Sequence, residues 1–158
     1  MNTMPDKALD KDKKVSMKIT SSKLGEIEYK EDDIITLSSP LLGFPDLSDF
    51  LIISDDKSYP FLWFQSVEDT DICFILVEAQ TFFKDYNPII SKRELKLLAI
   101  GPKDDMKLFC IVVVPNDPKL STANLRAPLV VNFDKKLAKQ IILDDDSYQI
   151  KTPLFKSE

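Results

Sequence analysis

The side chains of this sequence that could carry out chemistry are carboxylates, lysines and two cysteines, because the chain contains no histidine. Without an imidazole the chain can form neither a Ser-His nor a Cys-His nucleophile, nor any His-containing metal site. Cys73 and Cys110 lie far apart inside apolar runs, so they offer no C-x-x-C zinc site. We expect both to be reduced thiols buried in the core, since two cysteines do not by themselves imply a disulfide.

Three consecutive aspartates, Asp144, Asp145 and Asp146, form the most acidic short run of interest. An EF-hand loop needs alternating acidic positions, a glycine and a distal glutamate, and this run lacks that spacing. Neighbouring residues of an extended segment point to opposite faces, so the three carboxylates cannot converge without a sharp turn. We interpret the run first as a solvated end of a strand, then as an acidic surface that faces a protein, and only third as a metal site.

A second group of candidates belongs to an alternative interpretation, in which the chain is a small β-barrel ligand-binding protein or a carboxylate-dependent enzyme. Asp71 or Glu78 would then act as acid or base near Gln65. The three glycines of the chain are too few for a Gly-rich phosphate loop, and no cofactor or metal is predicted. An enzyme should show a deep pocket with a carboxylate of perturbed pKa, whereas a binding protein should show a shallow apolar patch with an acidic rim.

The composition limits the class of protein further. A chain of 158 residues, 44% of them hydrophobic, suits one compact domain. Its net charge of −5 argues against non-specific nucleic-acid binding, which depends on Lys and Arg, and permits a basic protein as partner. The N-terminus lacks the apolar region of a signal peptide, and no apolar run approaches the ~18 residues of a membrane span. We therefore predict a cytoplasmic protein that binds neither membranes nor nucleic acid directly.

The elements that must position these side chains are mostly short strands. Alternating or continuous runs of apolar residues between polar turns predict a mainly β fold, a small antiparallel β-barrel-like domain with one short helix. The helix should begin at Ser91, as N-cap with Glu94 closing a capping box, and end before Gly101. Residues 1–16 are charged and almost free of apolar side chains, so we predict a disordered leader before a single domain over 17–158. The predicted strands cover 25–29, 33–37, 50–53, 59–66, 72–77, 106–114, 129–133 and 137–143.

One stretch, residues 122–132, is predicted to form a turn and the first strand of a hairpin that leads into the acidic run. Asn124 is a turn former, and Pro128 belongs at the start or edge of a strand because it has no N–H to give. The two runs after it read as a β-hairpin with a short charged loop, and the second run passes directly into Asp144–Asp146. Turn, hairpin and acidic run are therefore predicted to lie together.

This stretch resembles the flagellar assembly factor FliW family, whose members carry a T-A-N-L-x-A-P-[IL]-V-[IV]-N run and a later L-D-D-S-x-Y. The first matches residues 122–132, and the second matches 143–148 with one extra aspartate. Further similarity extends from Met17 to Phe155. It includes F-F-x-D-Y-x-P at 82–88 and an ending similar to H-P-L-F, in which Thr152 replaces the usual histidine.

The resemblance implies a β-barrel that is not an enzyme and that switches between two partners. FliW proteins bind cytoplasmic flagellin and, when flagellin is exported, bind the carbon storage regulator CsrA, which relieves the block by CsrA on flagellin mRNA translation. A third interpretation is a chaperone that binds flagellin alone. The predicted partner-binding residues are Asn124, Leu125, Pro128, Asp144, Asp145, Asp146, Leu154 and Phe155.

Overall fold

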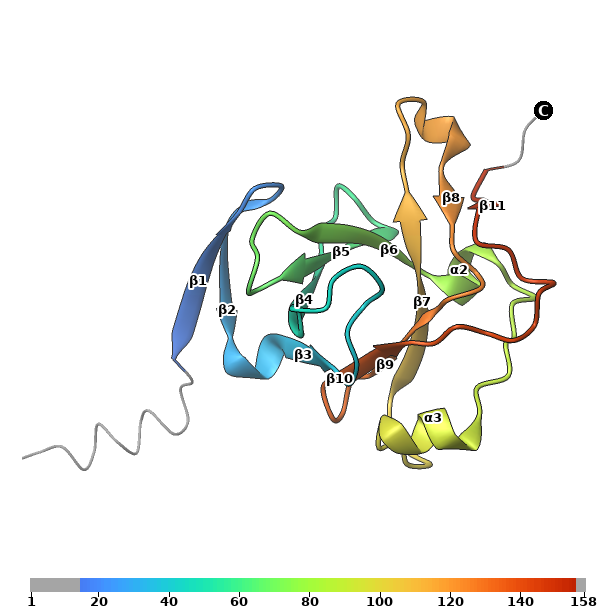
Figure 1. Ribbon diagram of the computed structural model, residues 1–158. Coiled ribbons are helices and arrows are strands. Elements are labelled where there is room, and N and C mark those ends of the chain that lie inside the picture. The colour runs from blue at the N-terminus through green and yellow to red at the C-terminus, as the bar shows by residue number, and fades with distance from the viewer. Residues whose placement is uncertain (1–14, 156–158) are drawn as a thin grey trace, which may run out of the picture.

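The computed structural model describes residues 15–155 and shows a closed β-barrel (Figure 1). Seven strands follow one another around the barrel in the order β7-β6-β5-β4-β3-β10-β9, and β9 pairs with β7 to close it. β8 and β11 extend the sheet beyond β7. The barrel strands are β3 (Ile34–Leu37), β4 (Asp49–Ser54), β5 (Phe61–Ser66), β6 (Cys73–Glu78), β7 (Met106–Val113), β9 (Leu129–Asn132) and β10 (Leu137–Gln140); the extension is β8 (Thr122–Ala123) and β11 (Thr152–Pro153).

This architecture confirms the predicted barrel-like domain, with two differences. The pairing of β3 with β10 is parallel, with Leu137 opposite Thr36, while the other pairings are antiparallel. Parallel neighbours need a long connection, which the hundred or so residues between these strands supply. In the part of the chain that the structure describes, a second α-helix, α2 (Ala79–Phe82), accompanies the expected α3 (Lys92–Leu97), and the 3₁₀ turns are η1 (Glu31–Asp33) and η2 (Pro118–Leu120).

The core fills the barrel with side chains from alternate positions of its strands. Phe50 and Phe64 are fully buried and stack with ring centroids 4.2 Å apart. Both sit on neighbouring strands, where aromatic cross-strand contacts stabilise the pairing. Further core side chains come from the other strands and the 41–47 loop: Ile35, Leu37, Leu41, Leu47, Leu76, Phe109, Leu129, Val131 and Ala138.

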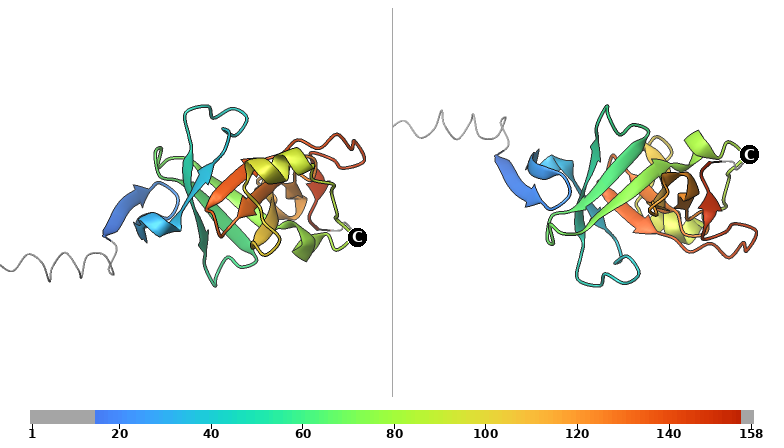
Figure 2. Two further views of the ribbon diagram at one scale, coloured as in Figure 1. Left: turned by 90° about the horizontal axis from the view of Figure 1, so that it is seen from below. Right: turned by 90° about the horizontal axis from the view of Figure 1, so that it is seen from above.

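A two-stranded hairpin, β1 (Ser16–Ser21) and β2 (Gly25–Lys30), stands at one end of the molecule, opposite α3 and the C-terminal segment (Figure 2). β1 begins at Ser16, which pairs with Lys30, so the expected leader overlaps the first strand by one residue; residues 1–14 lie outside the described residues. The hairpin is anchored by a 2.6 Å hydrogen bond from the Ser21 hydroxyl to Gln65 Oε1. The Gln65 amide nitrogen donates to the carbonyls of Ser66 and Ile72, so this buried side chain at the end of β5 has hydrogen-bond partners for both of its polar atoms.

The two cysteines are free thiols, as predicted, but they differ in burial. Cys110 in β7 is fully buried, and burial raises the pKa of its thiol to about 12. Cys73 is only half-buried, so the expectation that both lie in the core is wrong for this residue. Cys73 is the first residue of β6, at a strand end that neighbouring strands cover less completely. Burial still raises the pKa of Cys73, against the opposing charge of Lys23.

Candidate partner-binding surface

The turn after β8 is built by the side chain of Asn124. Its amide oxygen accepts hydrogen bonds from the backbone N–H groups of Arg126, at 3.1 Å, and Ala127, at 3.0 Å. Asn forms this turn readily because its short side chain can imitate a backbone carbonyl two residues ahead. The turn directs Leu125 and Pro128 inward, where both are buried. Asn124 therefore shapes the backbone that carries the next contacts.

The acidic segment is held on this turn at both of its ends. The Leu143 N–H donates to the Arg126 carbonyl at 2.8 Å, and the Leu125 N–H donates to the Gln149 carbonyl at 3.0 Å. The Arg126 Nε donates in return to the Leu143 carbonyl at 3.2 Å. Residues 144–148 are thus a short loop between two fixed points, and the prediction that turn and acidic run lie together is confirmed.

Within this loop one aspartate has a structural role. Asp145 Oδ1 accepts hydrogen bonds from the Ser147 backbone N–H at 3.0 Å and from its hydroxyl at 2.6 Å. These bonds, led by the hydroxyl, hold the pKa of the Asp145 carboxyl below its usual value. Asp144 and Asp146 are exposed on either side of it. The loop therefore presents three exposed aspartates, and Asp145 also shapes the turn.

The helix α3 lies beside this loop and is fixed at its start. Ser91 is the N-cap, as predicted, and its hydroxyl accepts a hydrogen bond from the Glu94 N–H at 3.2 Å. The Glu94 carboxylate does not close the predicted capping box but forms an ion pair with Lys139 of β10, at 2.8 Å. Both side chains are largely shielded from solvent. This ion pair joins the first turn of the helix to the barrel wall.

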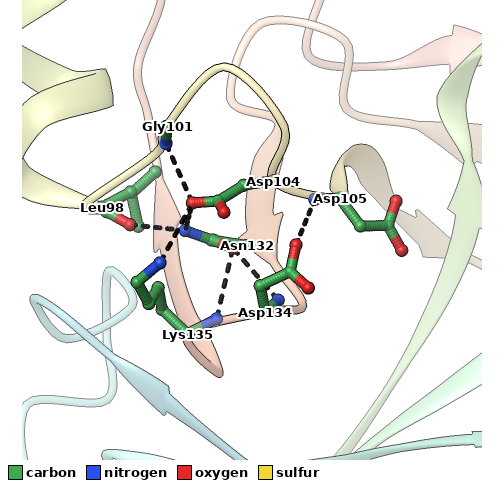
Figure 3. A network of polar contacts seen from close by, with 7 residues as sticks. All are labelled: Leu98, Gly101, Asp104, Asp105, Asn132, Asp134 and Lys135. Atoms are coloured by element: carbon green, nitrogen blue, oxygen red, sulfur yellow. Dashed lines mark hydrogen bonds and ion pairs between the residues drawn. The ribbon is translucent and has the colours of Figure 1, made fainter.

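The end of α3 is joined to the barrel by the fully buried Asn132, at the end of β9 (Figure 3). Its amide nitrogen donates to the Leu98 carbonyl at 2.9 Å and to Asp104 Oδ2 at 3.2 Å. Its amide oxygen accepts from the backbone N–H of Asp134 at 3.1 Å, in the β9–β10 turn. One buried side chain thus satisfies the helix end, the following loop and the hairpin turn together.

These contacts leave a groove of about 700 Å³ between the 87–91 segment, α3, β10 and the acidic loop. We call it the α3 groove. Ile89 and Ile142 line it and are 91% and 59% exposed, far more than apolar side chains of the core. Asp144 and Asp145 form its acidic rim. The groove is thus largely apolar, with Asp144 and Asp145 at one edge and the Glu94–Lys139 ion pair and Arg93 also in its lining.

The eight predicted partner-binding residues fall into three places in the structure. Asn124, Leu125 and Pro128 form the buried framework under the acidic loop, and Leu125 is only 7% exposed. Asp144 and Asp145 line the α3 groove, and the exposed Asp146 follows them on the same loop. Leu154 packs against the core cluster around Tyr86, while the 43% exposed Phe155 lines a separate pocket with Tyr59 and Trp63.

Sequence reasoning did not find the apolar half of the groove. The sequence did contain a pattern that indicates an exposed Ile142. Side chains alternate along the extended segment after β10, so Ile141 and Leu143 are buried and Ile142 faces solvent. No comparable signal marked Ile89, because the other wall of the groove, residues 139–148, lies about 50 residues further along the chain. The long-range ion pair between Glu94 and Lys139 also has no local pattern.

Of the residues named for an alternative enzyme, Asp71 and Gln65 make structural hydrogen bonds, and Glu78 lies at the far end of β6 from Cys73, which faces Gln65. The Asp71 carboxylate accepts a hydrogen bond from the Ser22 hydroxyl and helps to fasten the β1–β2 hairpin. The Gln65 amide group is occupied by Ser21 and nearby carbonyls. Within residues 15–155, no three His, Cys, Asp or Glu side chains are grouped so that they could hold a metal ion. The described helices also include none long and apolar enough to cross a membrane.

The profile of the family described as FliW protein matches residues 18–154. The flagellar assembly factor FliW of Bdellovibrio bacteriovorus is 37% identical over 139 residues, which is 88% of this chain and 79% of that protein. The FliW of Natranaerobius thermophilus is 38% identical over 143 residues, 90% of this chain and 95% of that protein.

The structure is also similar to that of a FliW protein. A crystal structure of the flagellar assembly factor FliW superimposes with a TM-score of 0.84 and 32% sequence identity, and covers 90% of this chain and 99% of that chain. The sequence motifs, the barrel and the matched length agree with one another. The chain therefore belongs to the FliW family.

Proposed function

We propose that this protein is a cytoplasmic flagellar assembly factor that binds flagellin and, when flagellin is exported, binds CsrA and relieves its block on flagellin mRNA translation. Membership of the FliW family supports the role in flagellar assembly. It also supports a function through protein contacts and not through catalysis. The partners are inferred from the resemblance together with the chemistry of the α3 groove.

The observation that carries the proposal is that an exposed apolar residue, Ile142, and an exposed carboxylate, Asp144, line the same groove. Protein interfaces combine an apolar centre, which is buried on binding, with a polar rim. A partner for this surface should offer apolar side chains inside a basic border. CsrA-type proteins bind RNA and should carry such basic surface, which the aspartates would attract while repelling RNA phosphates.

The two kinds of side chain should have different kinetic roles. Carboxylates on the rim act over a distance, so they increase the association rate in a salt-dependent way. Ile142 acts only on contact, so its loss should increase the dissociation rate. The buried Leu125 is unsuited to this test, because its truncation would perturb the core cluster around Tyr86.

The experiment measures binding kinetics with purified CsrA and, separately, flagellin at two salt concentrations. Asp144→Asn with Asp146→Asn should slow association by about threefold to tenfold at low salt and flatten its salt dependence. Ile142→Ala should speed dissociation by about tenfold, the equivalent of ~1.4 kcal/mol of lost contact. The double variant Asp46→Asn with Asp56→Asn changes the charge equally on exposed loops that do not line the groove, and it should behave like the wild type.

Three results would count against parts of this proposal. If both groove variants bind like the wild type at both salt concentrations, the partner surface lies elsewhere. If flagellin binds but CsrA does not, the protein is a flagellin chaperone without the regulatory role. If neither protein binds the wild type, the partner assignment is wrong.

A further inference from the structure

Two strand edges without a backbone partner border a second groove, on the opposite side of the molecule from α3. Within the described residues, β2 pairs with β1 alone. The pairing of β4 with β3 ends at Leu51, opposite Ile34, while β4 continues to Ser54 along β5. Residues 52–54 of β4 therefore pair with β5 on one side only. On their other side they have no strand partner, because β3 pairs only with residues 49–51. Unpaired edges of this kind can accept an additional strand.

Both edges contribute to one cavity of about 330 Å³, which we call the hairpin groove. Three consecutive residues of β2 and three of β4 line it, which indicates that it runs along both strands. Figure 1 shows β2 on the side of the hairpin that faces the barrel. The residues concerned are Ile27, Glu28 and Tyr29 of β2 and Leu51, Ile52 and Ile53 of β4.

The floor and rim of this groove differ in chemistry. Ile27, Ile52, Ile53 and Phe133 are apolar side chains that remain partly accessible, so an entering side chain could still bury their surface. Glu28 and Asp33 are the carboxylates of its lining, and Lys136 is the basic residue of that lining; Lys18 of β1 stands opposite Glu28 in the ladder. The segment 25–33 that forms this side of the groove contains five carboxylates and one lysine. The site is therefore apolar inside and acidic outside.

We propose that the hairpin groove binds an extended, basic segment of a protein partner by strand addition. The backbone of that segment pairs with the open edge of β2, and alternate residues point in opposite directions. One set of apolar side chains fills the floor over Ile52 and Phe133. The other set, Lys or Arg, faces Glu28 and Asp33 at the rim.

Charge complementarity selects this occupant over a second copy of the chain. A symmetric contact would place β2 against the β2 of the other copy and bring together two surfaces with the same excess of carboxylates. Like charges on directly opposite strands are destabilising. The hairpin groove is separate from the α3 groove, so this proposal does not depend on the identity of the partners proposed above.

The test uses the full chain and a capped synthetic peptide of alternating Val and Lys, six residues long. Backbone NMR should show shifted amide signals and slower hydrogen exchange at 27–29 and 52–54 when the peptide is added. A Val/Glu peptide of the same pattern should bind about tenfold more weakly or worse, because its charge matches that of the rim. A Val/Lys peptide with a central Pro should also bind more weakly, because it has lost a ladder donor.

Protein variants separate the groove from general charge attraction. Glu28→Lys should weaken binding of the Val/Lys peptide about tenfold or more, since it reverses charge at the rim. Asp56→Lys makes the same change of net charge in the exposed 55–60 turn, away from the residues that line the groove, and should have little effect.

The following outcomes would overturn the proposal. One is no binding of the Val/Lys peptide, or equal binding of the Val/Glu and Val/Lys peptides. Another is peptide-induced change confined to other parts of the barrel. Self-association with protection of 27–29 would assign the groove to a second copy. Binding that requires removal of residues 1–14 would assign it to the chain's own N-terminal segment.

Discussion

The hydroxyl of Tyr86 donates a 2.7 Å hydrogen bond to the carbonyl oxygen of Leu125, inside the protein. Tyr86 follows α2, and Leu125 lies in the turn whose neighbours hold the acidic loop. The ring of Tyr86 also contacts Tyr148 at the end of that loop, edge to face with centroids 4.9 Å apart. Burial, with Cys110 and Tyr148 nearby, raises the pKa of the Tyr86 hydroxyl well above its usual value, so it stays a donor across the physiological range.

Replacement of Tyr86 by Phe should lower the free energy of unfolding by about 1–2 kcal/mol, because it leaves the buried Leu125 carbonyl without its donor. Chemical denaturation at neutral pH measures this change. Tyr59→Phe is the matched control, since Tyr59 is 71% exposed. Equal stability of Tyr86→Phe and the wild type would show that the carbonyl finds another donor.

Asp104 should make the protein sensitive to acid. The Gly101 N–H, the Asn132 amide and Lys135 hold the pKa of its carboxyl below the usual value, against the opposing effect of burial. A carboxyl whose pKa is lower in the folded state stabilises that state above the unfolded pKa, about 3.9 for Asp. This stabilisation is lost as the pH falls through the lower folded value. The wild type should therefore exceed Asp104→Asn in stability at pH 6, and the difference should shrink below pH ~4.

Denaturation of both proteins at a series of pH values checks this expectation. A difference in stability that stays constant down to strongly acidic pH would show that the charge of Asp104 has no part in it.

The cysteines should react at different rates in the native protein. Because the thiolate is the reactive form, burial and a raised pKa both slow alkylation. Cys110, with a pKa of about 12, should be labelled by a bulky reagent only after denaturant is added. Half-buried Cys73 should be labelled slowly in the native state, and faster as the pH rises. The variants Cys73→Ser and Cys110→Ser assign each signal, and rapid native labelling of Cys110 would contradict its place in the core.

Removal of residues 1–14 should leave the thermal midpoint nearly unchanged, because this segment has few apolar side chains to bury. The cut is placed before Val15 so that β1, which begins at Ser16, stays complete. Differential scanning calorimetry compares the two chains. A fall of many degrees would show that the segment contributes to the stability of the barrel.

Local pattern was sufficient for the kind of fold. Runs of alternating or continuous apolar residues marked the barrel strands, and the short charged loop after Phe133 predicted the β9–β10 hairpin, which the register confirms. Ser91 was recognisable as an N-cap because capping depends on neighbours within one turn of helix. The motif over 122–132 likewise showed that turn, hairpin and acidic run belong together.

What the sequence by itself determined, then, was the strands, their local partners and the family. Only the tertiary structure decided that β3 and β10 pair in parallel and that Leu125 faces inward. It alone also showed that Ile89 and Asp144 line the same groove. The physical reason is that a period of two tells which residues share a face, but not which distant strand or loop covers that face. Whether an apolar side chain joins the core or a binding surface depends on that cover, and therefore on contacts between segments far apart in the chain.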